Sequence, residues 1–167
     1  MQPDPEYRIY STIDPQKFGQ GARMMAESEP WITLGIDYDH CLQAFSGPCK
    51  EIFIIESESV MKGFVILQVC GTFSGYIQTL CVASGSRGKG LGWKLLEFSE
   101  QRIHESSPNV FICVSSFNQE ALKLYYSFGF TLVGTLKDFV KAGFDELLLR
   151  KTIGPRQGYM PASGKDI

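Results

Sequence analysis

The sequence predicts an α+β (mixed α/β) fold, with one central mixed sheet of roughly six to seven strands flanked by about four helices. Three observations lead to this prediction. Residues 1–50 hold interrupted helical segments, residues 51–82 hold three β-rich runs in succession, and residues 83–153 alternate helix and strand. A helix that joins two strands usually makes them parallel, so a parallel pair is expected in the middle of a mostly antiparallel sheet.

The N-terminal part should contribute one short strand and two helices. Residues 7–11 alternate weakly between apolar and polar side chains, which is typical of a strand. Asp14 is a favoured N-cap and Pro15 suits the first helical position, so a helix should run from there to about residue 27. Residues 37–45 predict a second short helix.

The remaining elements follow from periodicity and from breaks at glycine and proline. The predicted strands are 52–56, 63–70, 76–82, 110–114, 130–136 and 144–152. An amphipathic helix should run from Gly92 to about residue 105, and another from about residue 118 to residue 128. We expect residues 1–153 to form a single domain and residues 154–167 to form a poorly ordered tail.

Composition excludes several classes of function. The net charge of −2 gives no overall field that would favour nucleic acid or an anionic membrane. No apolar run approaches ~18 residues, and the N-terminus lacks the pattern of a signal peptide. We therefore expect a cytoplasmic protein with neither a nucleic-acid nor a membrane partner.

The five cysteines are odd in number, widely spaced and free of any CxxC pair. This pattern argues against a disulfide framework and against a structural zinc site, and it favours a reducing compartment. Cys70, Cys81 and Cys113 fall in apolar strands, so we expect buried, inert thiols there and no bound metal.

The most informative segment is residues 82–92, which leave a strand, pass through four glycines and two cations, and enter a helix. Glycine lets the backbone approach a ligand closely, and the first N–H groups of a helix form an anion site. Arg87 and Lys89 add positive charge at its rim. Neither a P-loop nor the dinucleotide pattern GxGxxG fits this spacing. The segment therefore predicts a phosphate-binding turn, with a plain glycine-rich helix start as the alternative.

Two motifs resemble the signatures of the GNAT superfamily of acyl-CoA-dependent N-acyltransferases. Residues 87–92 (RGKGLG) are similar to the first signature, Arg/Gln-x-x-Gly-x-Gly/Ala. Residues 118–130 are similar to the second, N-x-x-A-x-x-L-Y-x-x-x-G-F, at the usual separation of one strand. The resemblance covers residues 76–136 well and implies a GNAT-like sheet whose central parallel pair splays beyond Val82 and Val114.

The resemblance also implies a binding site for acetyl-CoA. Backbone N–H groups of the first signature would hold the pyrophosphate, and the pantetheine arm would pair with the preceding strand like an added strand. Asn118 matches a position that often contacts this arm, and is also a favoured helix cap. The residues implied in cofactor binding are Leu80, Cys81, Val82, Arg87, Gly88, Lys89, Gly90, Leu91, Gly92 and Asn118.

Tyr125 matches the tyrosine that often stands near the CoA sulfur as general acid, although it also lies on a core stripe of its helix. Some members carry a glutamate early in the strand before the first signature, where this chain has Tyr76 and Gln78. Those two residues and Trp31 are candidate substrate contacts. The identity of the general base therefore stays open, and the candidates are Glu27, Glu29 and His40.

Two further polar features are given no catalytic role. His104 falls in the last turn of its helix, where a cation suits the helix dipole. Asp145 and Glu146 precede the final strand and are expected to form a solvated turn.

The function predicted is transfer of an acetyl group from acetyl-CoA to a primary amine, on a small molecule or a peptide, by direct attack in a ternary complex. A non-catalytic acyl-CoA-binding sensor or subunit is the alternative, and a nucleotide-phosphate enzyme is a third. A homodimer is plausible for such a family.

Overall fold

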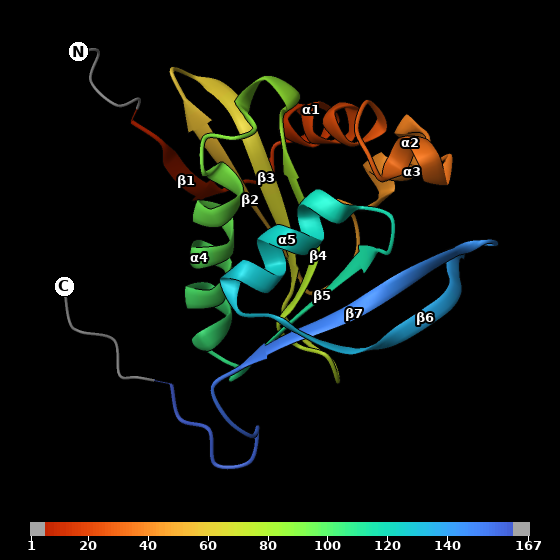
Figure 1. Cartoon of the computed structure of the whole chain (residues 1–167). Coiled ribbons are helices and arrows are strands. Elements are labelled where there is room, and N and C mark those ends of the chain that lie inside the picture. Colours follow the sequence, from red (N-terminus) through yellow and green to blue (C-terminus); the bar gives the residue numbers. More distant parts are fainter. Residues whose placement is uncertain (1–5, 162–167) are drawn as a thin grey trace.

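The computed structural model describes residues 6–161 and contains one seven-stranded sheet in the order β1-β2-β3-β4-β5-β7-β6 (Figure 1). Only β4 and β5 are parallel neighbours. The predicted mixed fold with a central parallel pair is therefore confirmed. The strands are β1 (Arg8–Ser11), β2 (Lys50–Ser57), β3 (Val60–Gln68), β4 (Tyr76–Val82), β5 (Asn109–Ser115), β6 (Thr131–Lys141) and β7 (Phe144–Thr152).

Five α-helices flank this sheet: α1 (Pro15–Ala26), α2 (Trp31–Leu34), α3 (Tyr38–Gln43), α4 (Leu91–His104) and α5 (Gln119–Phe128). A short 3-10 turn, η1 (Ser84–Ser86), precedes α4. Capping explains where the helices begin: the Asp14 side chain accepts a hydrogen bond from the Gln16 N–H at the start of α1, as the sequence predicted. The helix α2 was missed because its four residues are too few to show a helical period.

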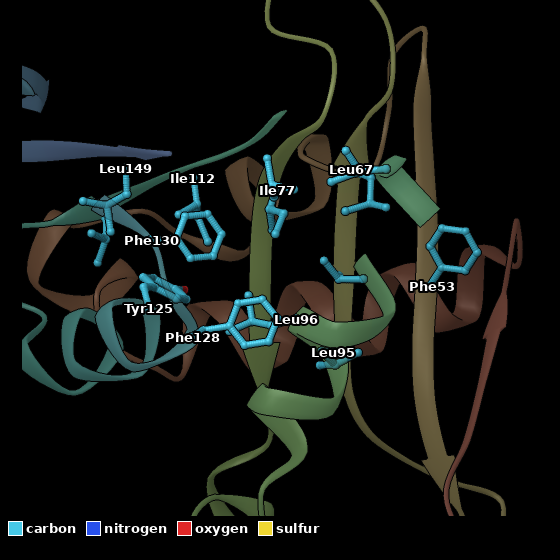
Figure 2. Packing of buried hydrophobic residues seen from close by; sticks show 14 of the residues in the cluster. Phe53, Leu67, Ile77, Leu95, Leu96, Ile112, Tyr125, Phe128, Phe130 and Leu149 are labelled. Carbon is cyan, nitrogen blue, oxygen red and sulfur yellow. The ribbon is translucent and has the colours of Figure 1, made fainter. Parts of the chain in front are cut away.

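The helices pack on opposite faces of the sheet and bury two separate clusters. The cluster below α4 and α5 joins these helices to inward side chains of the strands, among them Ile77 of β4, Ile112 of β5 and Leu149 of β7. Figure 2 shows Tyr125 of α5 beside Ile112 and Leu149 in this cluster. The second cluster lies on the other face, against α1 and α3. A ligand in a gap of this sheet would therefore contact α4 and α5 on one face and α1 and α3 on the other.

The parallel strands β4 and β5 separate much earlier than predicted. Their pairing is limited to Tyr76 with Phe111 and Ile77 with Ile112, so the gap opens before Val82 and Val114 are reached. The expected splay point is wrong because β4 bulges at this position: its register against β3 shifts between Ile77 and Thr79. Each strand keeps its antiparallel partner on the far side, which holds the gap open.

The prediction that no disulfide forms is also wrong, because Cys49 and Cys70 are bonded, with their Cα atoms 5.7 Å apart. The two residues stand where β2 begins and β3 ends, and these strands are antiparallel neighbours. Sequence spacing gives no sign of this, since the pair is brought together by strand register. Cys41, Cys81 and Cys113 are free thiols.

The predicted tail lies partly outside the described residues. Residues 154–161 form neither helix nor strand, but the Tyr159 hydroxyl donates to the His104 carbonyl at 2.5 Å and Arg156 donates to the Thr72 carbonyl at 3.2 Å. Within residues 6–161, no helix is long and apolar enough to cross a membrane.

Candidate acyl-transfer site

A cavity of about 640 Å³ runs from the start of α4, through the gap between β4 and β5, to the loop and helix at residues 29–36. Its volume is typical of sites for small molecules and cofactors. It is lined from both faces of the sheet, because the gap leaves no main-chain ladder between β4 and β5 beyond Ile77. Such a cavity can bring two ligands together inside the sheet, one from each side.

The first end of the cavity is a cradle of backbone N–H groups. Among the described residues, none accepts a hydrogen bond from the N–H groups of residues 88–93. Gly88 and Gly90 have φ values of 72° and 75°, which glycine adopts without strain, and a Cβ added at either would meet open space. Unpaired N–H groups at the positive end of α4 can bind a diphosphate, so the residues present fit this part of CoA.

The free edge of β4 continues from this cradle. Ala83 N–H donates to Lys62 of the neighbouring β3, whereas the Val82 carbonyl accepts from the Arg87 Nε at 3.2 Å on the other side. Because successive residues of a strand direct their main-chain groups to opposite sides, Leu80 also faces the gap and Cys81 faces β3. The main-chain pairing expected from Cys81 is thus excluded by the strand geometry, although its side chain lines the cavity.

Tyr125 lies where the cavity passes through the sheet. Its side chain is 6% exposed and lines the cavity, and its hydroxyl has no hydrogen-bond partner in the described part of the chain. Burial, with a smaller contribution from Cys81, raises the pKa of Tyr125, so the hydroxyl keeps its proton at neutral pH. Tyr126, the next residue of α5, is 46% exposed and does not line the cavity.

Asn118 is the cap of α5 and also lies at the cavity, where its predicted contact with the cofactor stays a prediction. Its Oδ1 accepts from the Ala121 N–H at 3.3 Å and so caps α5, and the residue also lines the cavity. The residues that the sequence predicted for cofactor binding, for substrate contact and as the general acid all line the cavity, except Lys89.

The second end of the cavity carries a polar cluster on the α1 face of the sheet, formed by Tyr76, Cys113, Ser115 and Glu146. Ser115 of β5 and Glu146 of β7 are directly paired across the strands, and the Ser115 hydroxyl donates to Glu146 Oε1 at 2.6 Å. Burial raises the pKa of Glu146, and the Ser115 hydrogen bond partly opposes this shift. Burial also raises the pKa of Tyr76 and of Cys113, which lie beside each other.

Glu146 lines the cavity, although the sequence did not indicate it as a site residue. The prediction of a solvated turn at Asp145 and Glu146 is wrong: the turn ends at Gly143, both residues belong to β7, and Glu146 is only 6% exposed. Strand alternation alone places residues 146, 148 and 150 on one face. Only the register of β7 against β5 reveals that this face meets Ser115 and the cavity.

The loop and helix at residues 29–36 close the second end. Trp31 lines the cavity and also packs against the α1-side cluster, so it both walls the pocket and fixes the loop. The Gln78 side chain donates to the Ala44 carbonyl at 3.1 Å. Of the candidate bases, Glu29 lines the cavity, whereas Glu27 and His40 do not.

Comparison with known proteins agrees with this geometry. Residues 8–130 match the family described as "Acetyltransferase (GNAT) family". The chain belongs to the GNAT acetyltransferase family. The resemblance found in the two motifs, and the prediction of an acetyltransferase, are thereby confirmed. The family match ends before β6 and β7, so Glu146 lies outside it.

Several solved structures share this GNAT fold. A protein from Desulfovibrio desulfuricans, described as an acetyltransferase of the GNAT family, is 17% identical with a TM-score of 0.73, covering 89% of this chain and 100% of its own. The ribosomal-protein-S18-alanine N-acetyltransferase of Escherichia coli is 18% identical with a TM-score of 0.71, covering 97% and 100%. The Salmonella typhimurium protein yncA, solved with its cofactor acetyl-CoA, is 16% identical with a TM-score of 0.67, covering 94% and 98%. A search of curated proteins finds no match.

Proposed function

We propose that this GNAT protein transfers an acetyl group from acetyl-CoA to a primary amine, on a small molecule or a peptide, by direct attack within a ternary complex. The observation that carries the proposal is the continuous cavity, which links the unpaired N–H groups of residues 88–93 to the Tyr125 hydroxyl and then to a polar pocket on the opposite face. Donor and acceptor can therefore enter from different sides and meet in the gap.

The donor would lie along the first half of the cavity. The N–H groups at the start of α4 would hold its pyrophosphate, and Leu80 and Val82 would pair with the pantetheine arm at the free edge of β4. The acetyl-CoA found with yncA supports this choice of donor.

The proposed chemistry needs a proton for the departing thiolate and a neutral amine as nucleophile. The buried Tyr125 hydroxyl, which holds its proton at neutral pH, would protonate the sulfur as the carbon–sulfur bond breaks. Direct transfer is favoured over an acyl-cysteine intermediate because the thiols that line the cavity, Cys81 and Cys113, both have raised pKa values and hence little thiolate.

The test is release of free CoA thiol from acetyl-CoA in the presence of a panel of primary amines, with mass spectrometry of the product. The proposal predicts thiol release that depends on the amine and an acetylated product of the expected mass. Tight acetyl-CoA binding without transfer to any amine would instead support the sensor that the sequence left as the alternative.

A further inference from the structure

The proposed reaction begins with an acceptor that is charged at neutral pH. An alkyl ammonium group has a pKa of ~10.4, so it must lose a proton before its nitrogen can attack the thioester. A base within reach of the cavity is required, directly or through one water.

Glu146 is the best placed group for this role. Among residues 6–161 it is the one carboxylate that is less than a tenth exposed, and it lines the cavity on the side away from the α4 cradle. Ser115 binds its Oε1, while its Oε2 has no hydrogen-bond partner within the described residues. The carboxylate is thus fixed in orientation and keeps one oxygen for a ligand.

The other candidates suit the role less well. Glu29 is exposed, and both of its carboxylate oxygens are already used, since they accept hydrogen bonds from the Thr33 hydroxyl (2.9 Å) and from the Thr33 N–H (3.2 Å). Tyr76 and Cys113 keep their protons at neutral pH because burial raises their pKa values. His40 is exposed, pairs with Asp37 at 2.7 Å and does not line the cavity.

The walls around Glu146 also indicate what kind of amine fits. The second end of the cavity is lined by apolar side chains from the loop and helix at residues 29–36 and from β6: Trp31, Leu34, Ile36, Phe139 and Val140. The hairpin of β6 and β7 is tied to α2 here, because Lys141 Nζ donates to the Thr33 carbonyl at 2.9 Å. Arg87, at the opposite end, is the single cation among the described lining residues. Lys141 does not line the cavity and its Nζ is bound to the Thr33 carbonyl, so no lining side chain at this end would neutralise a carboxylate on the acceptor.

We infer that Glu146 binds the ammonium group of the acceptor through Oε2 and takes its proton, and that the acceptor is a primary amine with apolar carbons, and no carboxylate, beside the nitrogen. The inference rests on the proposed function and names the substrate class of the same site.

The step balances without any further reactant. One ammonium proton moves to the Glu146 carboxylate, and the freed electron pair forms the nitrogen–carbon bond as the thioester carbonyl becomes tetrahedral. The carbon–sulfur bond then breaks, the sulfur takes the Tyr125 proton, and Tyr125 regains one from the nitrogen through water. Glu146 releases its proton to solvent.

The matched variants are Glu146→Gln and Asp145→Asn, two neighbouring residues of β7 that point to opposite faces. Gln keeps the shape and the Ser115 hydrogen bond but cannot take a proton. We expect E146Q to lower kcat/KM for an amine by roughly 10²-fold or more while leaving the acetyl-CoA Kd unchanged, and D145N to behave as the wild type. Wild-type rates in E146Q would overturn the inference alone. Absence of transfer by the wild type to every amine would overturn the proposed function as well.

Ser115→Ala gives a second test, which does not depend on the folding of E146Q. The Ser115 hydrogen bond lowers the Glu146 pKa, so its removal should move the acid limb of the kcat/KM profile to higher pH. Tyr76, Cys113 and Tyr125 on the cavity walls lose protons only at higher pH. Glu29→Gln and Glu120→Gln serve as controls for the two exposed carboxylates that line the cavity. An acid limb that S115A leaves in place, or that E29Q or E120Q removes, would contradict the assignment.

The substrate class is tested with 2-phenylethylamine and phenylalanine, which differ by one carboxylate beside the amine. Repulsion by Glu146 should make kcat/KM for 2-phenylethylamine higher by about tenfold or more. Equal or better use of phenylalanine would overturn the predicted class.

Discussion

Tyr125 of α5 and Glu146 of β7 lie on opposite faces of the sheet, beside the gap between β4 and β5. Each is buried and lines the same cavity. Burial keeps the proton on the tyrosine, which suits an acid, and raises the pKa of the carboxyl, which suits a base. Burial alone therefore suits Tyr125 to the role of acid and Glu146 to the role of base.

Replacing Tyr125 with Phe should lower kcat by roughly 10²-fold or more, because the thiolate then leaves without a proton donor. The acetyl-CoA Kd should stay close to the wild-type value, as measured by calorimetry beside steady-state thiol release. Tyr126→Phe, on the exposed side of the same helix, is the control and should be unaffected. Unchanged turnover in Y125F would remove Tyr125 from the mechanism.

Glu146→Gln should change stability in a pH-dependent way. Burial raises the folded-state pKa of Glu146, so the protonated carboxyl is favoured by folding, and this contribution is lost as pH rises through the folded pKa. The variant should therefore unfold at a higher temperature than the wild type at pH 8, with the difference vanishing near pH 4. A variant less stable than the wild type at pH 8 would mean that the charged carboxylate is well paired.

At the scale of elements, sequence patterns located the β4–turn–α4 unit and α5 because their signals are local. Four glycines and two cations mark the turn, and Asn118 and Gly129 mark the ends of α5. The bulge in β4, the Cys49–Cys70 bond and the burial of Glu146 were missed because each depends on strand register. Register is fixed by residues distant in sequence, which a local pattern does not contain.

We expect a negative charge placed in the turn before α4 to weaken cofactor binding. Gly90→Glu should weaken acetyl-CoA binding by about tenfold or more, because a carboxylate would occupy the anion site. Gly90→Ala is the control: a Cβ there meets open space, so Ala introduces only the strain of a left-handed backbone. Equal affinity of a folded G90E and the wild type would place the pyrophosphate elsewhere.

The Cys49–Cys70 bond should stabilise the β2–β3 pair. It closes a loop with a sequence separation of 21, for which chain entropy predicts a contribution of about 3 kcal/mol. Cys49→Ser should lower the free energy of unfolding in urea by that order, and adding a reductant to the wild type should have the same effect. If a reductant leaves the free energy of unfolding of the wild type unchanged, the disulfide does not make this contribution.

At the scale of the whole molecule, the proposed function assigns donor and acceptor to opposite faces of the sheet. The α4 and α5 face would receive acetyl-CoA, and the α1 to α3 face, closed by the tip of the β6–β7 hairpin, would receive the amine (Figure 1). The family match covers residues 8–130, which include the donor half and the 29–36 segment of the acceptor half, whereas Glu146 and the tip of the β6–β7 hairpin lie outside it. Family membership therefore defines the donor chemistry better than the acceptor, in keeping with the general rule that a fold does not fix a substrate.

Calorimetric titration of the purified protein with acetyl-CoA, beside ATP and NAD, tests the predicted cofactor site without any knowledge of the acceptor. We expect one acetyl-CoA to bind per chain, with micromolar affinity or tighter, and neither ATP nor NAD to bind comparably. Absence of acetyl-CoA binding, or equal binding of ATP, would contradict this prediction.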